Sequence, residues 1–71
     1  TLILQLSNHT IMKELFKSII ENDKQISIET MEKILIECNY HEYSYNKAMK
    51  LIPEIAYELK LQLPKQFFSN N

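Results

Sequence analysis

The sequence predicts an all-α fold, a small bundle of three to four helices in which the last long helix is bent or broken at Pro53. Three observations predict it. Apolar residues recur at intervals of three and four along most of the 71 residues, which is the spacing of amphipathic helices. Hydrophobic residues make up 45% of the chain, too many for a disordered segment. Polar connections at 22–25 and 40–44 separate the periodic stretches.

The first helix is predicted from about Asn8 to Asn22. The polar residues at 7–10 supply a candidate N-cap. Residues 1–6 either extend this helix backwards or form a separate turn, and we favour the helix. The apolar stripe consists of adjacent pairs that recur every four residues: Ile11, Met12, Leu15, Phe16, Ile19 and Ile20.

The second helix is predicted to begin at Ser27 or the residue after it, because Ser27 is a good N-cap and Ile26 with Met31 has the spacing of a hydrophobic staple. Since the chain has no glycine, we expect Asn39 to end the helix in the left-handed conformation, and Asn, Asp, Ser or Pro to make the tight turns. We expect Cys38 to be buried. The predicted core face is Ile28, Met31, Ile34, Leu35 and Cys38.

The third periodic stretch runs from Tyr45 to Pro64, with one helical phase on both sides of Pro53. We interpret it as one bent helix that ends at Pro64. The alternative is a fourth helix that begins at Pro53, since proline suits a first helical position. Residues 64–71 are expected to form a tail. The predicted core face is Tyr45, Ala48, Met49, Ile52, Ile55, Ala56, Leu59 and Leu63.

Composition narrows the class of protein. A chain of 71 residues makes a single domain, 1–71, and without an initiator methionine we expect it to be a fragment of a longer protein. Eight basic residues, all lysine, against nine acidic ones give a formal charge of −1, which argues against a nucleic-acid partner. No apolar run is long enough for a membrane span. The lone Cys38 permits no internal disulfide, so an intracellular location, cytoplasm or nucleus, is expected.

No residue pattern predicts catalysis or a metal site. His41 lies near Glu37 and Glu42, but a metal site needs three or four convergent ligands. Residues 21–40 resemble the second half of an EF-hand, yet Lys24 and Thr30 stand where that family has its glycine and its bidentate glutamate. We therefore expect no enzyme, no cofactor, no metal and no small-molecule substrate.

Residues 31–52 resemble the first two helices of a ubiquitin-associated domain. Residues 38–40, Cys-Asn-Tyr, replace that family's Met-Gly-Phe/Tyr loop, and Ala48 with Met49 replaces its Ala-Leu pair. The resemblance implies a surface around 38–40 that binds ubiquitin. The family's glycine is missing here, and no loop precedes Pro53 where its third helix would begin.

A nucleic-acid alternative also remains. In a helix-turn-helix, the segment from Tyr45 to Leu51 would enter a groove and present Asn46, Lys47 and Lys50. Both this reading and the ubiquitin reading describe a monomeric binding domain.

The leading functional prediction is a protein–protein interaction or homo-oligomerisation module. More large apolar residues are present than three helical stripes can bury, and an apolar surplus usually marks an interface. We expect a second copy of the chain or a partner protein helix to cover it, with Leu51 and Leu61 pointing away from the core at its centre. The predicted interaction surface is Leu4, Leu6, Ile36, Leu51, Leu61, Phe67 and Phe68.

Overall fold

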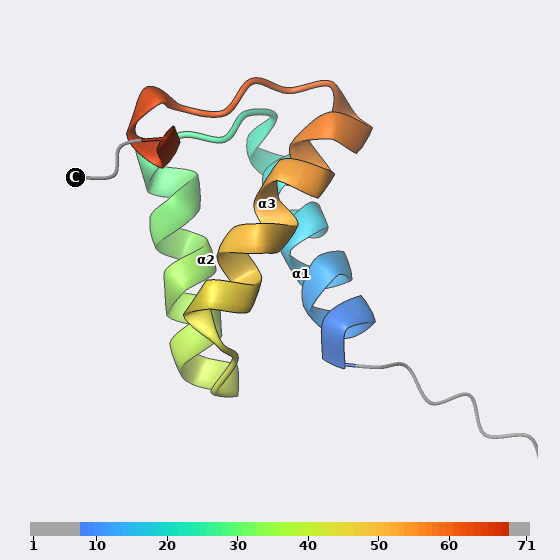
Figure 1. The fold of residues 1–71 in the computed structure, drawn as a ribbon, viewed down its shortest axis with the longest axis vertical. Helices are drawn as coiled ribbons and strands as arrows, with labels where there is room; N and C mark the ends of the chain where they lie inside the picture. The colour runs from blue at the N-terminus through green and yellow to red at the C-terminus, as the bar shows by residue number, and fades with distance from the viewer. Residues whose placement is uncertain (1–7, 69–71) are drawn as a thin grey trace, which may run out of the picture.

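The computed structural model describes residues 8–68, which form an all-helical bundle (Figure 1). Its elements are α1 (Asn8–Asp23), α2 (Ile28–His41), α3 (Tyr45–Leu59) and a short 3-10 helix, η1 (Lys65–Phe68). The three α-helices run in alternating directions, and the chain after α3 crosses the end of the bundle to reach the beginning of α2. The predicted all-α class is confirmed. Within this part of the chain, no helix has the length and apolarity needed to cross a membrane.

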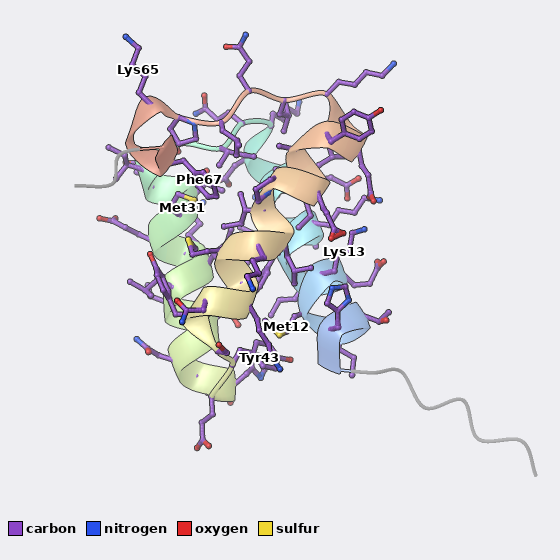
Figure 2. All side chains as sticks on the ribbon, in the orientation of Figure 1. Met12, Lys13, Met31, Tyr43, Lys65 and Phe67 are labelled. Atoms are coloured by element: carbon purple, nitrogen blue, oxygen red, sulfur yellow. The ribbon has the colours of Figure 1, made fainter. Side chains whose placement is uncertain are left out.

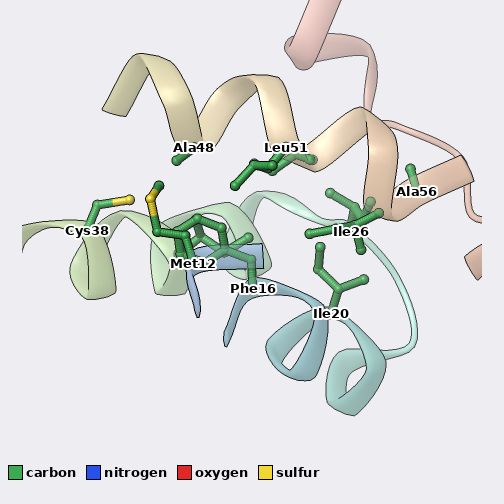
Figure 3. Packing of buried hydrophobic residues seen from close by; sticks show 11 residues of the cluster. Met12, Phe16, Ile20, Ile26, Cys38, Ala48, Leu51 and Ala56 are labelled. Atoms are coloured by element: carbon green, nitrogen blue, oxygen red, sulfur yellow. The ribbon is translucent and has the colours of Figure 1, made fainter. Parts of the chain in front are cut away.

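A single hydrophobic core lies between the three helices (Figure 3). Phe16 and Ile20 of α1 are fully buried, as are Ile34 of α2 and Ile52 of α3. Leu61, in the segment after α3, also packs against this core. The buried members are Met12, Phe16, Ile20, Ile26, Ile34, Cys38, Ala48, Leu51, Ile52, Ile55 and Ala56.

The helix beginnings follow local capping chemistry. Ser27 has an extended backbone, and its Oγ accepts a hydrogen bond from the backbone N–H of Thr30 at 3.2 Å, as predicted for the N-cap of α2. Ser44 caps α3 in the same way, accepting from the N–H of Lys47 at 3.4 Å. The described part of α1 starts at Asn8, the first described residue. The prediction for residues 1–6 lies outside the described residues.

The helix ends differ from the prediction. α2 does not end at Asn39 but continues to His41, and Glu42 takes the left-handed conformation with φ 58°. Lys24 and Lys60 also have positive φ, at 63° and 58°, so the expectation that Asn, Asp, Ser or Pro makes these turns is wrong. A left-handed non-glycine residue costs roughly 1–2 kcal/mol.

Hydrogen bonds at the ends of α2 and α3 offset that cost. After α2, the N–H of Tyr43 donates to the carbonyl of Cys38 at 2.9 Å, and after α3 the N–H of Leu61 donates to the carbonyl of Ala56 at 2.9 Å. These are the long-range bonds of the Schellman motif, which brings an apolar residue back onto the helix. Tyr43 and Leu61 both pack against the core. The packing of the apolar residue that follows the left-handed residue therefore determines where each helix ends.

α3 is one helix that continues through Pro53. The alternative of a fourth helix beginning at Pro53 is wrong, and so is the predicted end at Pro64, because α3 ends at Leu59. Proline removes one helical hydrogen bond and costs about 3 kcal/mol in a helix interior. The buried neighbours Ile52 and Ile55 hold both halves of α3 on the core and offset this cost. The bend itself stays a prediction.

The predicted tail, 64–71, contains η1. Its Phe67 is partly buried and packs against the core, as does Met31 of α2 (Figure 2). The C-terminal segment thereby covers the beginning of α2.

Candidate interaction surface

The structure places Leu51 in the core. Leu51 is only 2% exposed and lies among the buried residues of α3. The prediction that Leu51 points away from the core, at the centre of a self-complementary patch, is therefore wrong. α3 packs against both α1 and α2, so its buried arc is wider than one stripe and includes Leu51 at its edge.

The other predicted surface residues separate into three groups. Leu61 and Phe67 are partly buried and pack against the core, so Leu61 does not point away from it either. Ile36 is 63% exposed on α2. Leu4 and Leu6 lie outside the described residues, as does the side chain of Phe68. The structure therefore does not bring the predicted set together into one patch.

An exposed apolar surface lies instead on α2, on the side away from α1 and α3, and we call it the outer face of α2. Ile36 and Tyr40 are four residues apart and are therefore neighbours on the helix surface. Ile28 and Leu35 were predicted to be core, but both are substantially exposed. The face consists of Ile28 at 52% exposure, Leu35 at 41%, Ile36 at 63% and Tyr40 at 79%.

The rotation of α2 explains why these residues are exposed. The buried residues of α2 are Thr30, Ile34 and Cys38, one on every turn. Since each residue turns the helix by about 100°, Leu35 lies beside this buried line and Ile36 lies nearly opposite it. Three consecutive apolar residues at 34–36 cannot share one face of a helix. This run was the sequence feature that could have indicated an exposed apolar side chain on α2. The predicted burial of Cys38 is confirmed.

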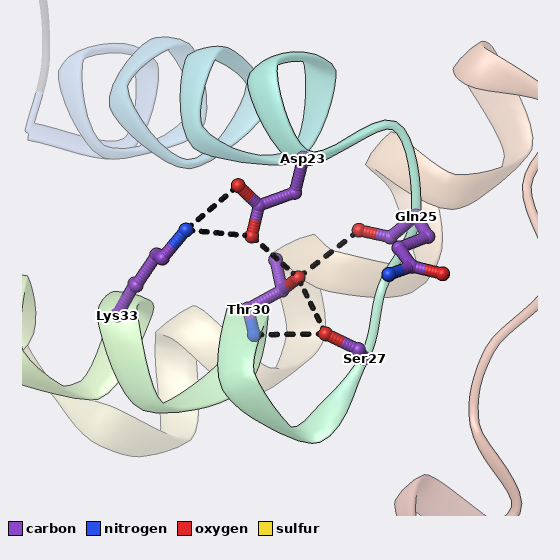
Figure 4. A network of polar contacts seen from close by, with 5 residues as sticks. All are labelled: Asp23, Gln25, Ser27, Thr30 and Lys33. Atoms are coloured by element: carbon purple, nitrogen blue, oxygen red, sulfur yellow. Dashed lines mark hydrogen bonds and ion pairs between the residues drawn. The ribbon is translucent and has the colours of Figure 1, made fainter.

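A polar network fixes this rotation (Figure 4). Thr30 is fully buried, and its Oγ1 donates to Asp23 Oδ2 at 2.8 Å. Ser27 Oγ lies 3.0 Å from the same hydroxyl, and the carbonyl of Gln25 lies at 3.2 Å. Lys33 Nζ binds both carboxylate oxygens of Asp23, at 2.8 and 3.0 Å. The hydrogen bond from Lys33, and after it that from Thr30, lowers the pKa of Asp23.

Ion pairs connect α1 with α3. Lys13 Nζ lies 2.6 Å from Glu58 Oε2 and 3.5 Å from Glu54 Oε2, and Lys17 Nζ lies 3.4 Å from Glu58 Oε1. The hydrogen bond from Lys13 is the main cause of the lowered pKa of Glu58, and it also raises the pKa of Lys13. α1 and α3 are therefore joined by charge as well as by the core.

The outer face of α2 carries two carboxylates that have no ion-pair partner within residues 8–68. Glu29 and Glu32 are both exposed. The nearest lysine in the sequence is Lys33, which is bound to Asp23. Glu37 pairs with His41, whose Nε2 lies 3.3 Å from Glu37 Oε1. The outer face is thus apolar with a negative charge.

A second surface feature is a cavity of about 570 Å³ between the beginning of α1 and the first half of α3. Lys47 and Lys50 contribute positive charge to it, and Glu42 and Glu54 contribute an equal negative charge. Asn46, Lys47 and Lys50, the residues of the helix-turn-helix reading, are all exposed. Its lining is His9, Met12, Glu42, Tyr43, Ser44, Lys47, Lys50, Leu51 and Glu54.

Of the residues that the ubiquitin-associated resemblance implies, Asn39 and Tyr40 are exposed and Cys38 is buried. Burial, with a smaller contribution from the charge of Glu37, raises the pKa of the Cys38 thiol. α3 has no break before Pro53 where the third helix of that family would begin. In the described part of the chain, no three His, Cys, Asp or Glu residues gather as metal ligands would.

No family model, curated protein or solved structure matches the chain.

Proposed function

We propose that this chain is a protein–protein interaction module and that the outer face of α2 is its contact surface. The observation that carries the proposal is the exposure of Ile36 and Tyr40, two large apolar side chains one turn apart on the same helix. Ile28 and Leu35 extend the apolar area to either side. Contiguous exposed apolar patches are typical of binding surfaces, whereas single exposed residues are not.

The energetics indicate binding of moderate strength. Complete burial of one large apolar side chain stabilises by about 1.5 to 3 kcal/mol, and association costs about 4 to 15 kcal/mol. The four residues of the face are already partly buried in the free chain, which reduces the gain. The gross gain is therefore at most about 12 kcal/mol, and the smallest association cost leaves no more than roughly 8 kcal/mol, so we expect a dissociation constant no tighter than about 1 μM.

Selection from a displayed library of helical peptides tests the location of the surface. The selection assumes no binding site in advance, because peptides are enriched by their affinity alone. Enriched peptides should bind the native chain and should lose affinity for Ile36→Lys and Tyr40→Lys. The matched control is Tyr57→Lys on α3, since Tyr57 is 87% exposed and does not belong to α2. Circular dichroism of each variant should show the native helical signal.

Two results decide the proposal. Loss of binding in the α2 variants with retention in Tyr57→Lys supports it. If the selected peptides bind all three variants as well as the native chain, the contact surface lies elsewhere and the proposal is wrong. Light scattering at about 100 μM, where a micromolar dimer would be mostly assembled, measures self-association in parallel.

A further inference from the structure

We infer that the outer face of α2 binds a basic amphipathic helix of another protein, with Lys or Arg beside its apolar stripe. This inference rests on the proposed function and names the occupant of the proposed surface. Two groups of residues carry it: the exposed apolar side chains of α2 and the unpaired carboxylates among them.

The carboxylates lie inside the apolar surface. Ile28, Glu32, Ile36 and Tyr40 follow one another at four-residue intervals, so they form one ridge along α2. Glu32 interrupts the ridge between two isoleucines. A partner that covers Ile28 and Ile36 must therefore also cover Glu32, and Glu29 lies next to Ile28 in the chain.

Residues 8–68 place no cation against these carboxylates. Lys33, the lysine within α2, directs its Nζ to both oxygens of Asp23. Neither Glu29 nor Glu32 makes an ion pair within the described part of the chain. Because a carboxylate removed from water without a cation or hydrogen-bond donors is strongly disfavoured, the partner has to bring such groups, and Lys or Arg supplies both the charge and the donors.

A helix meets both requirements. Its apolar residues at intervals of three and four can pack along the ridge, as in other grooves and faces that recognise helices. Lys or Arg at neighbouring positions of the same helix can reach Glu29 and Glu32. Charged groups of opposite sign then also set the orientation of the partner.

A second copy of the chain fits less well. In a parallel two-fold pairing of α2 with α2, Glu32 would face its own copy. In an antiparallel pairing of the two ridges, Glu32 would face Ile36 of the other copy, and the interface would enclose four carboxylates while the lysine of each α2 is bound to Asp23. The same charges that favour a basic helix therefore oppose self-association.

The experiment uses two synthetic peptides of about 18 residues, roughly five turns, with the same leucine spacing. One carries lysine at its polar positions and the other carries glutamate. Fluorescence anisotropy of the labelled peptides should show binding of the lysine peptide at least about tenfold tighter than that of the glutamate peptide. The preference should weaken as salt is raised.

Charge reversal provides the matched control. The double variant Glu29→Lys, Glu32→Lys should reverse the preference and bind the glutamate peptide more tightly. The double variant Glu14→Lys, Glu21→Lys makes the same change of net charge at two exposed positions of α1 and should keep the native preference. Ile36→Lys should weaken binding of the lysine peptide by about tenfold or more.

Each remaining result overturns the inference. Equal affinity for both peptides, binding of neither, or reversal by the α1 variant shows that charge on the outer face does not select the partner. A dimer in light scattering that Ile36→Lys dissociates makes a second copy the occupant, and this result contradicts the inference while supporting the proposed function. If Ile36→Lys changes neither peptide binding nor mass, and library-selected peptides also ignore it, the proposed function itself fails.

Discussion

The buried hydroxyl of Thr30, in the first turn of α2, donates a hydrogen bond of 2.8 Å to the carboxylate of Asp23, the last residue of α1. This bond joins two helices across a short connection and holds α2 in the rotation that exposes its outer face. A hydroxyl bonded to a carboxylate is a charge-assisted pair, which is stronger than a bond between neutral groups. The stability of the bundle and the position of the proposed contact surface therefore depend on the same contact.

The first prediction concerns the Thr30 hydroxyl. Thr30→Val keeps the shape of the side chain and removes the donor, so it should lower the free energy of unfolding by about 1 to 2 kcal/mol. Thr30→Ser keeps the hydroxyl and removes one methyl group, which costs about 0.8 kcal/mol. In an Asp23→Asn background the loss caused by Thr30→Val should shrink. Urea denaturation measures the free energy of unfolding of the native chain and of each variant. Equal losses from Thr30→Val in both backgrounds would contradict the contact.

The second prediction concerns pH. The pKa of Asp23 is lowered by hydrogen bonds from Lys33 and Thr30, so its carboxylate stabilises the fold above the ordinary pKa of about 3.8. That stabilisation is lost as the pH falls below 3.8 and through the folded-state pKa. Asp23→Asn should therefore be less stable than the native chain at pH 7, and the difference should become smaller as the pH falls below 3.8. A thermal-melting difference that stays constant over this range would refute the assignment.

The third prediction concerns the left-handed residue after α3. Lys60 has φ 58°, so Lys60→Gly removes a steric cost while adding freedom to the unfolded chain, and the net gain should be about 0.5 to 1 kcal/mol. The control Gln62→Gly lies two residues on, where φ is not positive, and should lower stability. Chemical denaturation compares the two variants. A loss of stability in Lys60→Gly would be evidence against the left-handed ending.

The fourth prediction separates a core leucine from an exposed isoleucine. Leu51→Ala should cost about 2 to 5 kcal/mol because Leu51 is enclosed between the helices. Ile36→Ala should change stability by no more than about 0.5 kcal/mol, since the side chain is 63% exposed. The urea midpoints of the two variants test this directly. Similar midpoints would mean that Leu51 is not a core residue.

The fold class and the beginning of α2 could be predicted from the sequence because both depend on local chemistry. Helical periodicity identifies the amphipathic segments, and serine is a residue type favoured at the N-cap position that Ser27 occupies. The rotation of α2 could not be predicted in this way. Thr30 is buried and Ile28 is exposed because Asp23, seven residues earlier and in another helix, accepts a hydrogen bond from the Thr30 hydroxyl.

The candidate surface depended on that rotation and on how much of α3 is buried. Ile36 was identified because it lies nearly opposite Ile34, a relation within one helix. Leu51 was misplaced because its burial depends on α1 and α2 lying on two sides of α3. Helical periodicity describes one helix at a time, so contacts that several helices make together lie outside what it predicts.

The position of Phe67 has a consequence for how the bundle opens. Its η1 helix lies near the beginning of α2, far along the chain from that helix, and the partly buried ring of Phe67 packs against the core. We expect this segment to detach before the central contacts among α1, α2 and α3 are lost. Amide hydrogen exchange should therefore be faster in η1 than around Ile34 and Ile52. This order would mean that η1 separates from the bundle before the core opens.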